Sequence, residues 1–198
     1  MTEWTTTSSD WVARNERLGT PSQAILVEGR RFEHVLEEFG VPYYLKVDIE
    51  GADRLCVEAL RHVAERPRYL SMESAKTSWD ELLGEFALFR ELGYRRFKVV
   101  NQRQVEKQCL PFPPREGAFC EHVFRYGSSG AFGDEAPGDW VSEAEALRMY
   151  RRIFLHYKLF GDDGVIRRIN LQRPVIWRLA SLLRFLPKNA WYDTHASR

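Results

Sequence analysis

The stretch that decides the fold is VPYYLKVDI, residues 41–49. It is β-branched and aromatic, and its apolar character is nearly continuous, which is typical of a strand buried on both faces of a parallel sheet. Residues 31–39 precede it with apolar side chains at helical spacing, and Gly40 ends that segment. The two patterns together predict a helix–strand unit of an α/β domain.

The alternation of helix and strand continues along the chain. We predict helices over about 52–65, 79–91 and 142–160, strands over 69–73 and 94–101, short strands at 24–27 and 122–126, and two short helical pieces around 165–169 and 175–186. Alternation through short loops that contain Gly or Pro favours an open, mostly parallel α/β sheet with right-handed crossovers. We therefore predict an α/β domain over residues 1–140 and a helical C-terminal extension over 141–198 that packs on it.

Composition and charge exclude some partners. The 29 basic and 28 acidic side chains give a net charge of +1, with no basic stripe, so we expect no nucleic-acid partner. The longest apolar stretch, residues 175–186, contains two arginines and is too short to span a bilayer, which needs about 20 apolar residues. The polar start of the chain does not read as a signal peptide. Three cysteines without zinc spacing indicate a reducing compartment, and we expect a cytoplasmic protein.

Polar residues at the strand ends are the candidate site, because ligands of open α/β sheets bind outside the carboxyl ends of the strands. This rule selects Lys46, Asp48, Glu50, Glu73, Asn101 and Gln102. The first three are spaced two apart and should share one face of their strand. Buried charges need partners, so they should be paired or should line a cleft. The alternative is an ion pair of Lys46 with Asp48 or Glu50 that only ties strand to helix.

Residues 44–53, YLKVDIEGAD, resemble the signature segment of the FkbM-type methyltransferases, which has the order K-x-D-x-E-G-A-E/D. The residues of the motif fall on Lys46, Asp48, Glu50, Gly51 and Asp53. The flanking order agrees, with a helical segment before the motif and the strand YLSME, ending in Glu, after it. The resemblance covers roughly residues 24–101.

The resemblance implies a fold similar to the class I methyltransferases, with a mostly parallel, Rossmann-like sheet and S-adenosylmethionine as cofactor. It implies O-methylation of a sugar or another hydroxylated metabolite. By this resemblance Asp48 lies near the methyl-transfer site and acts as general base or orients the acceptor hydroxyl, and Glu50 and Lys46 support it. We expect Asp48 and Gly51 to contact the cofactor, and Glu73 and Asn101 to contact the acceptor.

The cofactor half of such a domain should have a strand ending in D-x-G-x-N-x-G and a second strand ending in an acidic residue. Neither feature lies upstream of Lys46, and the glycine cluster GSSGAFG, residues 127–133, is interpreted as a surface loop or a lid. The sequence thus predicts the C-terminal half of a methyltransferase domain, with the N-terminal half truncated, lost or supplied by a partner chain. The alternative function is a catalytically incomplete fragment that acts as a binding or structural subunit.

Three weaker readings stay open. No spacing matches a standard metal site, although Asp48 and Glu50 have the chemistry to share a divalent cation. The tail WYDTH, residues 191–195, is predicted to dock by its aromatic rings or to form a small polar–aromatic site. An unrelated α/β hydrolase lacks support because the sequence has no G-x-S-x-G motif.

Overall fold

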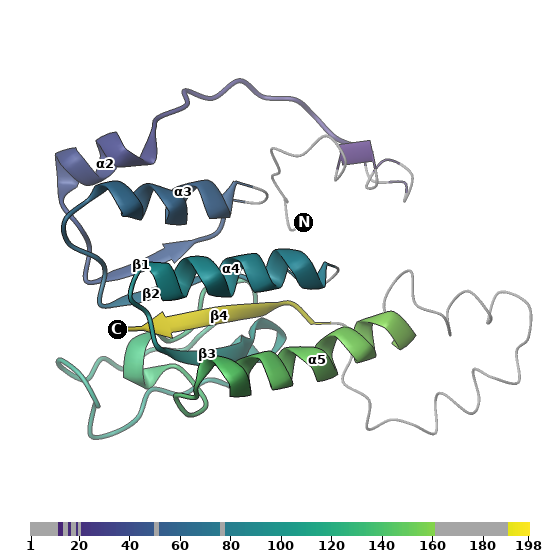
Figure 1. Cartoon of the computed structure of the whole chain (residues 1–198). Helices are drawn as coiled ribbons and strands as arrows, with labels where there is room; N and C mark the ends of the chain where they lie inside the picture. Colours follow the sequence, from purple (N-terminus) through teal and green to yellow (C-terminus); the bar gives the residue numbers. More distant parts are fainter. Residues whose placement is uncertain are drawn as a thin grey trace, which may run out of the picture.

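A computed structural model describes residues 12, 13, 16, 19, 21–49, 52–75, 78–160 and 190–198 of the chain. Figure 1 shows a sheet with helices packed along it. The helices of eight or more residues are α2 (Phe32–Phe39), α4 (Trp79–Glu91) and α5 (Glu143–Phe160), and α3 (Asp53–Ala59) continues into the short 3₁₀ turn η1 (Leu60–His62). The strands are β1 (Tyr44–Val47), β2 (Tyr69–Glu73), β3 (Arg96–Asn101) and β4 (Tyr192–Ser197). Two further 3₁₀ turns are η2 (Gln102–Lys107) and η3 (Gly133–Glu135).

Helix α4 shows how local sequence sets an element's bounds. The hydroxyl oxygen of Ser78 accepts a hydrogen bond from the backbone N–H of Glu81 at 3.2 Å, which satisfies one of the unpaired donors of the first turn. Gly93 follows the helix with φ +94°, a left-handed conformation that costs a glycine little. The predicted helix over 79–91 is therefore confirmed at both ends.

The described strands form one sheet in the order β1-β2-β4-β3. Strands β1 and β2 pair in parallel, whereas β4 pairs antiparallel with both β2 and β3. Strands β1, β2 and β3 therefore run in one direction, and β4 runs between the last two in the other. The prediction of a mostly parallel sheet is wrong for the described part of the chain, where two of the three pairings are antiparallel.

Helices α3, α4 and α5 cover one face of the sheet (Figure 1). Alternate strand residues point to this side, and Leu70, Phe97 and Ala196 lie there in one buried cluster with Phe86 and Phe89 of α4. Each fully buried side chain of this size contributes about 1.5–3 kcal/mol to folding. This apolar layer fixes the strand register, because a slip by one residue would turn these side chains to the other face.

A long connection between β3 and α5 covers the opposite face. The ring of Phe132 stacks on Tyr44 of β1 with centroids 4.4 Å apart, and Trp140 stacks on Tyr69 of β2 at 5.8 Å. Lys98 of β3 is buried and its ammonium donates hydrogen bonds to backbone carbonyls of the same connection. The predicted loop at 127–133 thus packs on the sheet through Phe132.

Strand β4 corrects the prediction for the tail. We expected residues 191–195 to dock by their aromatic rings, but residues 192–197 are a central strand hydrogen-bonded on both sides. The predicted division of the chain into two parts at residue 140 stays a prediction. In the structure α5 packs against β3, and β4 lies within the sheet. The helical pieces predicted around 165–169 and 175–186 lie outside the described residues.

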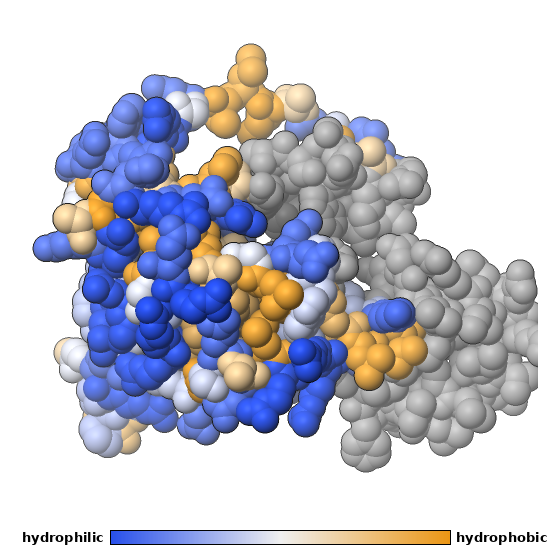
Figure 2. All heavy atoms as spheres, viewed as in Figure 1, coloured by the Kyte–Doolittle hydropathy of each residue, from blue (hydrophilic) through white to orange (hydrophobic). Residues whose placement is uncertain are grey.

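The short strands predicted at 24–27 and 122–126 are not present, because both segments have irregular backbone. Residues 21–31 form an arc over the end of the sheet that carries β1 (Figure 1), and Figure 2 shows apolar atoms exposed on this arc. Its side chains Ile25, Leu26 and Val27 are exposed. A β-branched, apolar segment needs a neighbouring strand to become a strand itself.

Candidate active site

The candidate site lies on the sheet face opposite the helices, toward the carboxyl ends of the parallel strands. Lys46 of β1 pairs in register with Ser71 of β2, and Glu73 pairs with Asp193 of β4. Side chains directly opposite each other in a sheet share a face. The register therefore brings Lys46, Glu73 and Asp193 to the same face of the sheet. They lie toward the carboxyl ends of the parallel strands, where ligands of α/β sheets bind.

Lys46 is the centre of a charged network. Its ammonium lies 2.5 Å from Oδ2 of Asp193 and 3.4 Å from Oδ2 of Asp48. The side-chain amide of Gln102, in the turn after β3, donates a hydrogen bond to the same Asp193 oxygen at 2.7 Å. The side chain of Asp193 is 1% exposed and that of Asp48 is 50% exposed. Asp48 is thus the carboxylate of this network that a ligand can reach.

The neighbouring carboxylates keep Lys46 protonated despite its burial. Burial alone would lower the pKa of Lys46, but the charge and hydrogen bond of Asp193, with a further contribution from Asp48, raise it above its ordinary value. Burial raises the pKa of the Asp193 carboxyl, and Lys46 offsets part of that rise. The lysine therefore remains a cation next to Asp48 over the physiological pH range.

Several buried polar atoms around Asp193 have no hydrogen-bond partner among the described residues. They are Oδ1 of Asp193, Oε1 of Gln102 and both ring nitrogens of His195. His195 lies two residues from Asp193 on the same face, and burial together with Lys46 and Lys98 lowers the pKa of its imidazole to about 3. The imidazole is therefore neutral, and the face offers polar atoms free to bind a ligand or water.

The predicted site residues are only partly brought together. Lys46, Asp48 and Glu73 lie on the face described above, as expected. Asn101 lies on the other face: it pairs in register with Tyr192, and its side-chain amide lies 3.4 Å from the Tyr192 hydroxyl oxygen. Glu50 and Gly51 lie outside the described residues, so their predicted roles remain predictions.

Sequence reasoning named Gln102 at a strand end and Asp193 in the tail, but it missed that both residues join Lys46 in one network. Asp193 is 147 residues from Lys46, and only the placement of β4 next to β2 brings the two together. A signal was present in YDTHAS, residues 192–197, where Tyr192, Thr194 and Ala196 alternate with Asp193, His195 and Ser197. Alternation of that kind is typical of a strand, but the polar side chains on both faces concealed it.

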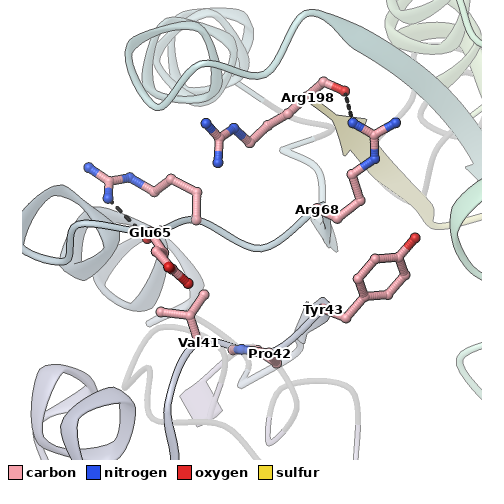
Figure 3. A pocket seen from close by; sticks show the side chains of 7 residues that line it. Val41, Pro42, Tyr43, Glu65, Arg68 and Arg198 are labelled. Atoms are coloured by element: carbon pink, nitrogen blue, oxygen red, sulfur yellow. Dashed lines mark hydrogen bonds between the residues drawn. The ribbon is translucent and has the colours of Figure 1, made fainter.

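A separate pocket of about 490 Å³ lies at the opposite ends of the strands. Figure 3 shows it between the segment before β1, the loop before β2 and the residue after β4. Arg68 donates a hydrogen bond to the backbone carbonyl oxygen of Arg198 at 2.8 Å. The pocket therefore belongs to a different part of the molecule from the Lys46 network.

The described residues contain neither a metal-binding cluster nor a membrane-spanning helix. No group of three or more His, Cys, Asp or Glu side chains is arranged to hold a metal ion in the part of the chain that the structure describes. The predicted alternative of a cation shared by Asp48 and Glu50 involves a residue outside that part. Among the described helices, none has the length and apolar character required to cross a bilayer.

The described fold is a mixed α/β sheet with helices on one face, and its charged network lies toward the carboxyl ends of the parallel strands, where ligands of open α/β sheets bind. Residues 1–96 match the family model of the methyltransferase FkbM domain. The predicted resemblance to the FkbM-type methyltransferases is therefore confirmed over these residues, which make up just under half of the chain. No curated protein and no solved structure matches the chain.

Proposed function

We propose that this chain carries the acceptor side of an S-adenosylmethionine-dependent O-methyltransferase that acts on a sugar or another hydroxylated metabolite. The observation that carries the proposal is the half-exposed Asp48 carboxylate, 3.4 Å from a lysine that a buried aspartate holds in place. The family match supports methyl transfer in general. The three cysteines are free, which supports the proposed cytoplasmic location.

Asp48 is the proposed general base. The cofactor would supply an electrophilic methyl group on a positively charged sulfur. When the bound cofactor gives up this methyl group to the acceptor oxygen, Asp48 would accept the proton of the acceptor hydroxyl. Lys46 places its positive charge 3.4 Å from the Asp48 carboxylate, and Asp193 and Gln102 hold Lys46 in place.

The described residues fit the methyl-acceptor part of such a site better than the part that binds the nucleoside. The exposed carboxylate of Asp48 suits a sulfonium or a hydroxyl, but no glycine-rich turn precedes Lys46 in the sequence. Strand β1 pairs only with β2 among the described strands, and its other edge is open. We propose that a further segment or a partner chain adds its strands at this edge and completes the cofactor site.

The alternative function is a ligand-binding or structural subunit without methyl transfer. The buried polar atoms around Asp193 that have no hydrogen-bond partner among the described residues favour ligand binding as such. In that case the buried polar atoms around Asp193 still bind a hydroxylated ligand, but no methyl group is transferred. The two functions share the site and differ only in the reaction.

The experiment that tests the proposal is methyl transfer from S-adenosylmethionine labelled on its methyl group. The purified chain is incubated with a panel of methyl glycosides and polyols, and labelled products are separated and counted. Removing a general base costs about 10²–10⁴ in rate, so Asp48→Asn should lose at least 100-fold. Asp80→Asn, an exposed carboxylate of α4, is the matched control and should keep full activity. Labelled product from Asp48→Asn at the wild-type rate rejects Asp48 as base. Acceptor binding without any product, once the segment or partner chain that completes the cofactor site is present, supports the alternative.

A further inference from the structure

An exposed pair of aromatic rings lies near the charged network. The rings of Tyr126 and Trp191 have centroids 5.8 Å apart and meet at 89°. Tyr126 is 54% exposed and Trp191 is partly exposed. Large aromatic side chains left in contact with solvent, next to buried polar groups, are typical of ligand sites, which combine aromatic surfaces with a few polar groups.

The sheet register places this pair beside Asp193. The backbone N–H of Gln102 donates to the carbonyl oxygen of Trp191 at 3.0 Å, which extends the β3–β4 ladder one step beyond Asn101 and Tyr192. Side chains alternate along an extended segment, so Trp191 is on the same side of the sheet as Asp193. Because β4 runs antiparallel, Trp191 lies nearer than Asp193 to the carboxyl ends of the other strands.

Gln102 connects the aromatic pair to the charges. Its backbone contacts Trp191, and its side-chain amide donates to the Asp193 oxygen that also binds Lys46. The backbone of Trp191, Gln102, the buried aspartate and the lysine are therefore linked by consecutive hydrogen bonds. Beyond Lys46 lies the half-exposed carboxylate of Asp48.

We propose that Tyr126 and Trp191 form an acceptor-binding platform for a pyranoside, a six-membered sugar ring. A pyranoside has an apolar face of C–H groups and an edge of hydroxyl groups. Aromatic rings offer a rigid, largely apolar surface for such a face, and the Tyr126 hydroxyl and the indole N–H add hydrogen-bonding groups. With the C–H face on the rings, the hydroxyl edge of the sugar would lie over the sheet face that carries Asp193 and the Lys46–Asp48 pair. This inference rests on the proposed function and names the acceptor class of the same site.

A second aromatic pair in the same connection provides an internal comparison. The rings of Phe112 and Phe119 are 5.1 Å apart at 82°, so their geometry resembles that of the platform. They flank Glu116, whose carboxylate accepts a hydrogen bond from Tyr69 at the start of β2, the opposite end of the strands. The phenylalanine pair therefore has the ring geometry of the platform but does not adjoin the Lys46–Asp193 network.

The test measures binding of methyl α-D-glucopyranoside, methyl α-D-mannopyranoside and methyl α-L-rhamnopyranoside by saturation-transfer NMR, without cofactor. We expect saturation of ring C–H protons by the wild-type chain. Trp191→Ala and Tyr126→Ala should weaken binding about tenfold, while Tyr126→Phe, which keeps the ring, should retain most of it. Phe112→Ala is the control and should bind as the wild type does. Circular dichroism confirms that each variant is folded.

The outcomes separate this inference from the proposed function. Binding that depends on Trp191 and Tyr126 without any methyl transfer retains the platform and rejects the enzyme. Transfer to a glycoside at an unchanged rate in Trp191→Ala and Tyr126→Ala overturns the platform and retains the enzyme. If the wild-type chain binds none of the three glycosides, or if Phe112→Ala loses as much binding as Trp191→Ala, the platform is also overturned.

Discussion

Replacing Lys46 with methionine tests whether the buried ion pair with Asp193 holds the sheet together. Methionine keeps the length and apolar stem of lysine but leaves the Asp193 carboxylate, 1% exposed, without its cation. Removing one partner of a buried pair costs about 3–5 kcal/mol, because the remaining charge is uncompensated. We expect a loss of that size in the free energy of unfolding at pH 7.5.

The loss should shrink at low pH. Burial already raises the pKa of Asp193, and without Lys46 it rises further. A raised carboxyl pKa means that the folded state binds a proton more readily than the unfolded state, so stability falls as pH rises from the unfolded pKa toward the folded one. We therefore expect Lys46→Met to recover part of its lost stability between pH 7.5 and pH 5.

Urea unfolding at the two pH values measures both effects against the wild type, so that the other titrating groups cancel. The control is Arg61→Met, which removes the exposed pair with Glu91 and should cost less than about 1 kcal/mol at either pH. The double variant Lys46→Met with Asp193→Asn should be more stable than Lys46→Met alone at pH 7.5. A loss in Lys46→Met below about 1 kcal/mol, or one independent of pH, would refute the reasoning.

Two further changes probe packing and burial. Gly133 has φ +62°, and an added Cβ would lie 3.0 Å from the Tyr69 ring, whereas Gly117 has the same φ with nothing within 4 Å. Gly133→Ala should therefore cost about 1–3 kcal/mol more in thermal unfolding than Gly117→Ala, and equal costs would contradict the contact. Burial raises the pKa of Glu85 to about 7, so its stabilising contribution is present at low pH and is lost as pH rises from about 4.5 to about 7. Glu85→Gln should be more stable than the wild type by about 2–3 kcal/mol at pH 8 and similar to it at pH 4.5. The control is Glu37→Gln, at an exposed position, which should have wild-type stability at both pH values. An equal gain in Glu85→Gln at both pH values would argue against the effect of burial on Glu85.

The sequence correctly predicted the elements that are buried on one face, such as α4, or along nearly their whole length, such as β2. Helix α4 and strand β2 have the predicted bounds, because apolar periodicity and turn residues mark both ends of each. Strand β1 is shorter than the predicted stretch 41–49, since pairing with β2 covers only Tyr44–Val47. Where one face is packed on helices, local pattern and tertiary structure agree.

The sheet's topology could not be read from the sequence. Strand β4 has polar residues on both faces. On the helix-covered face Thr194 shares hydrogen bonds with the hydroxyl groups of Ser74 and Tyr150, and on the opposite face Asp193 pairs with Lys46. These partners satisfy the polar groups of β4, but they come from distant parts of the chain. The alternation of strands and helices predicted parallel strands, and nothing local indicated that an antiparallel one lies between two of them.

The candidate site was half predictable for the same reason. Lys46 and Asp48 stand in one motif, and the rule of strand ends located them correctly on the exposed edge. The same rule placed Asn101 with them, but the one-residue alternation of β3 turns it to the helix face beside Tyr192. The place of Asp193 beside Lys46 depends on the register of β4 with β2, which only the three-dimensional structure provides.

The position of β4 has a consequence for synthesis on the ribosome. Strands β2 and β3 are made early, yet both pair with β4 and neither pairs with the other, so the sheet stays divided until residues 192–197 have been translated. During that interval Lys46 has no Asp193, and the facing edges of β2 and β3 are open to other chains. A nascent chain of this protein is thus expected to depend on chaperones until its last strand inserts.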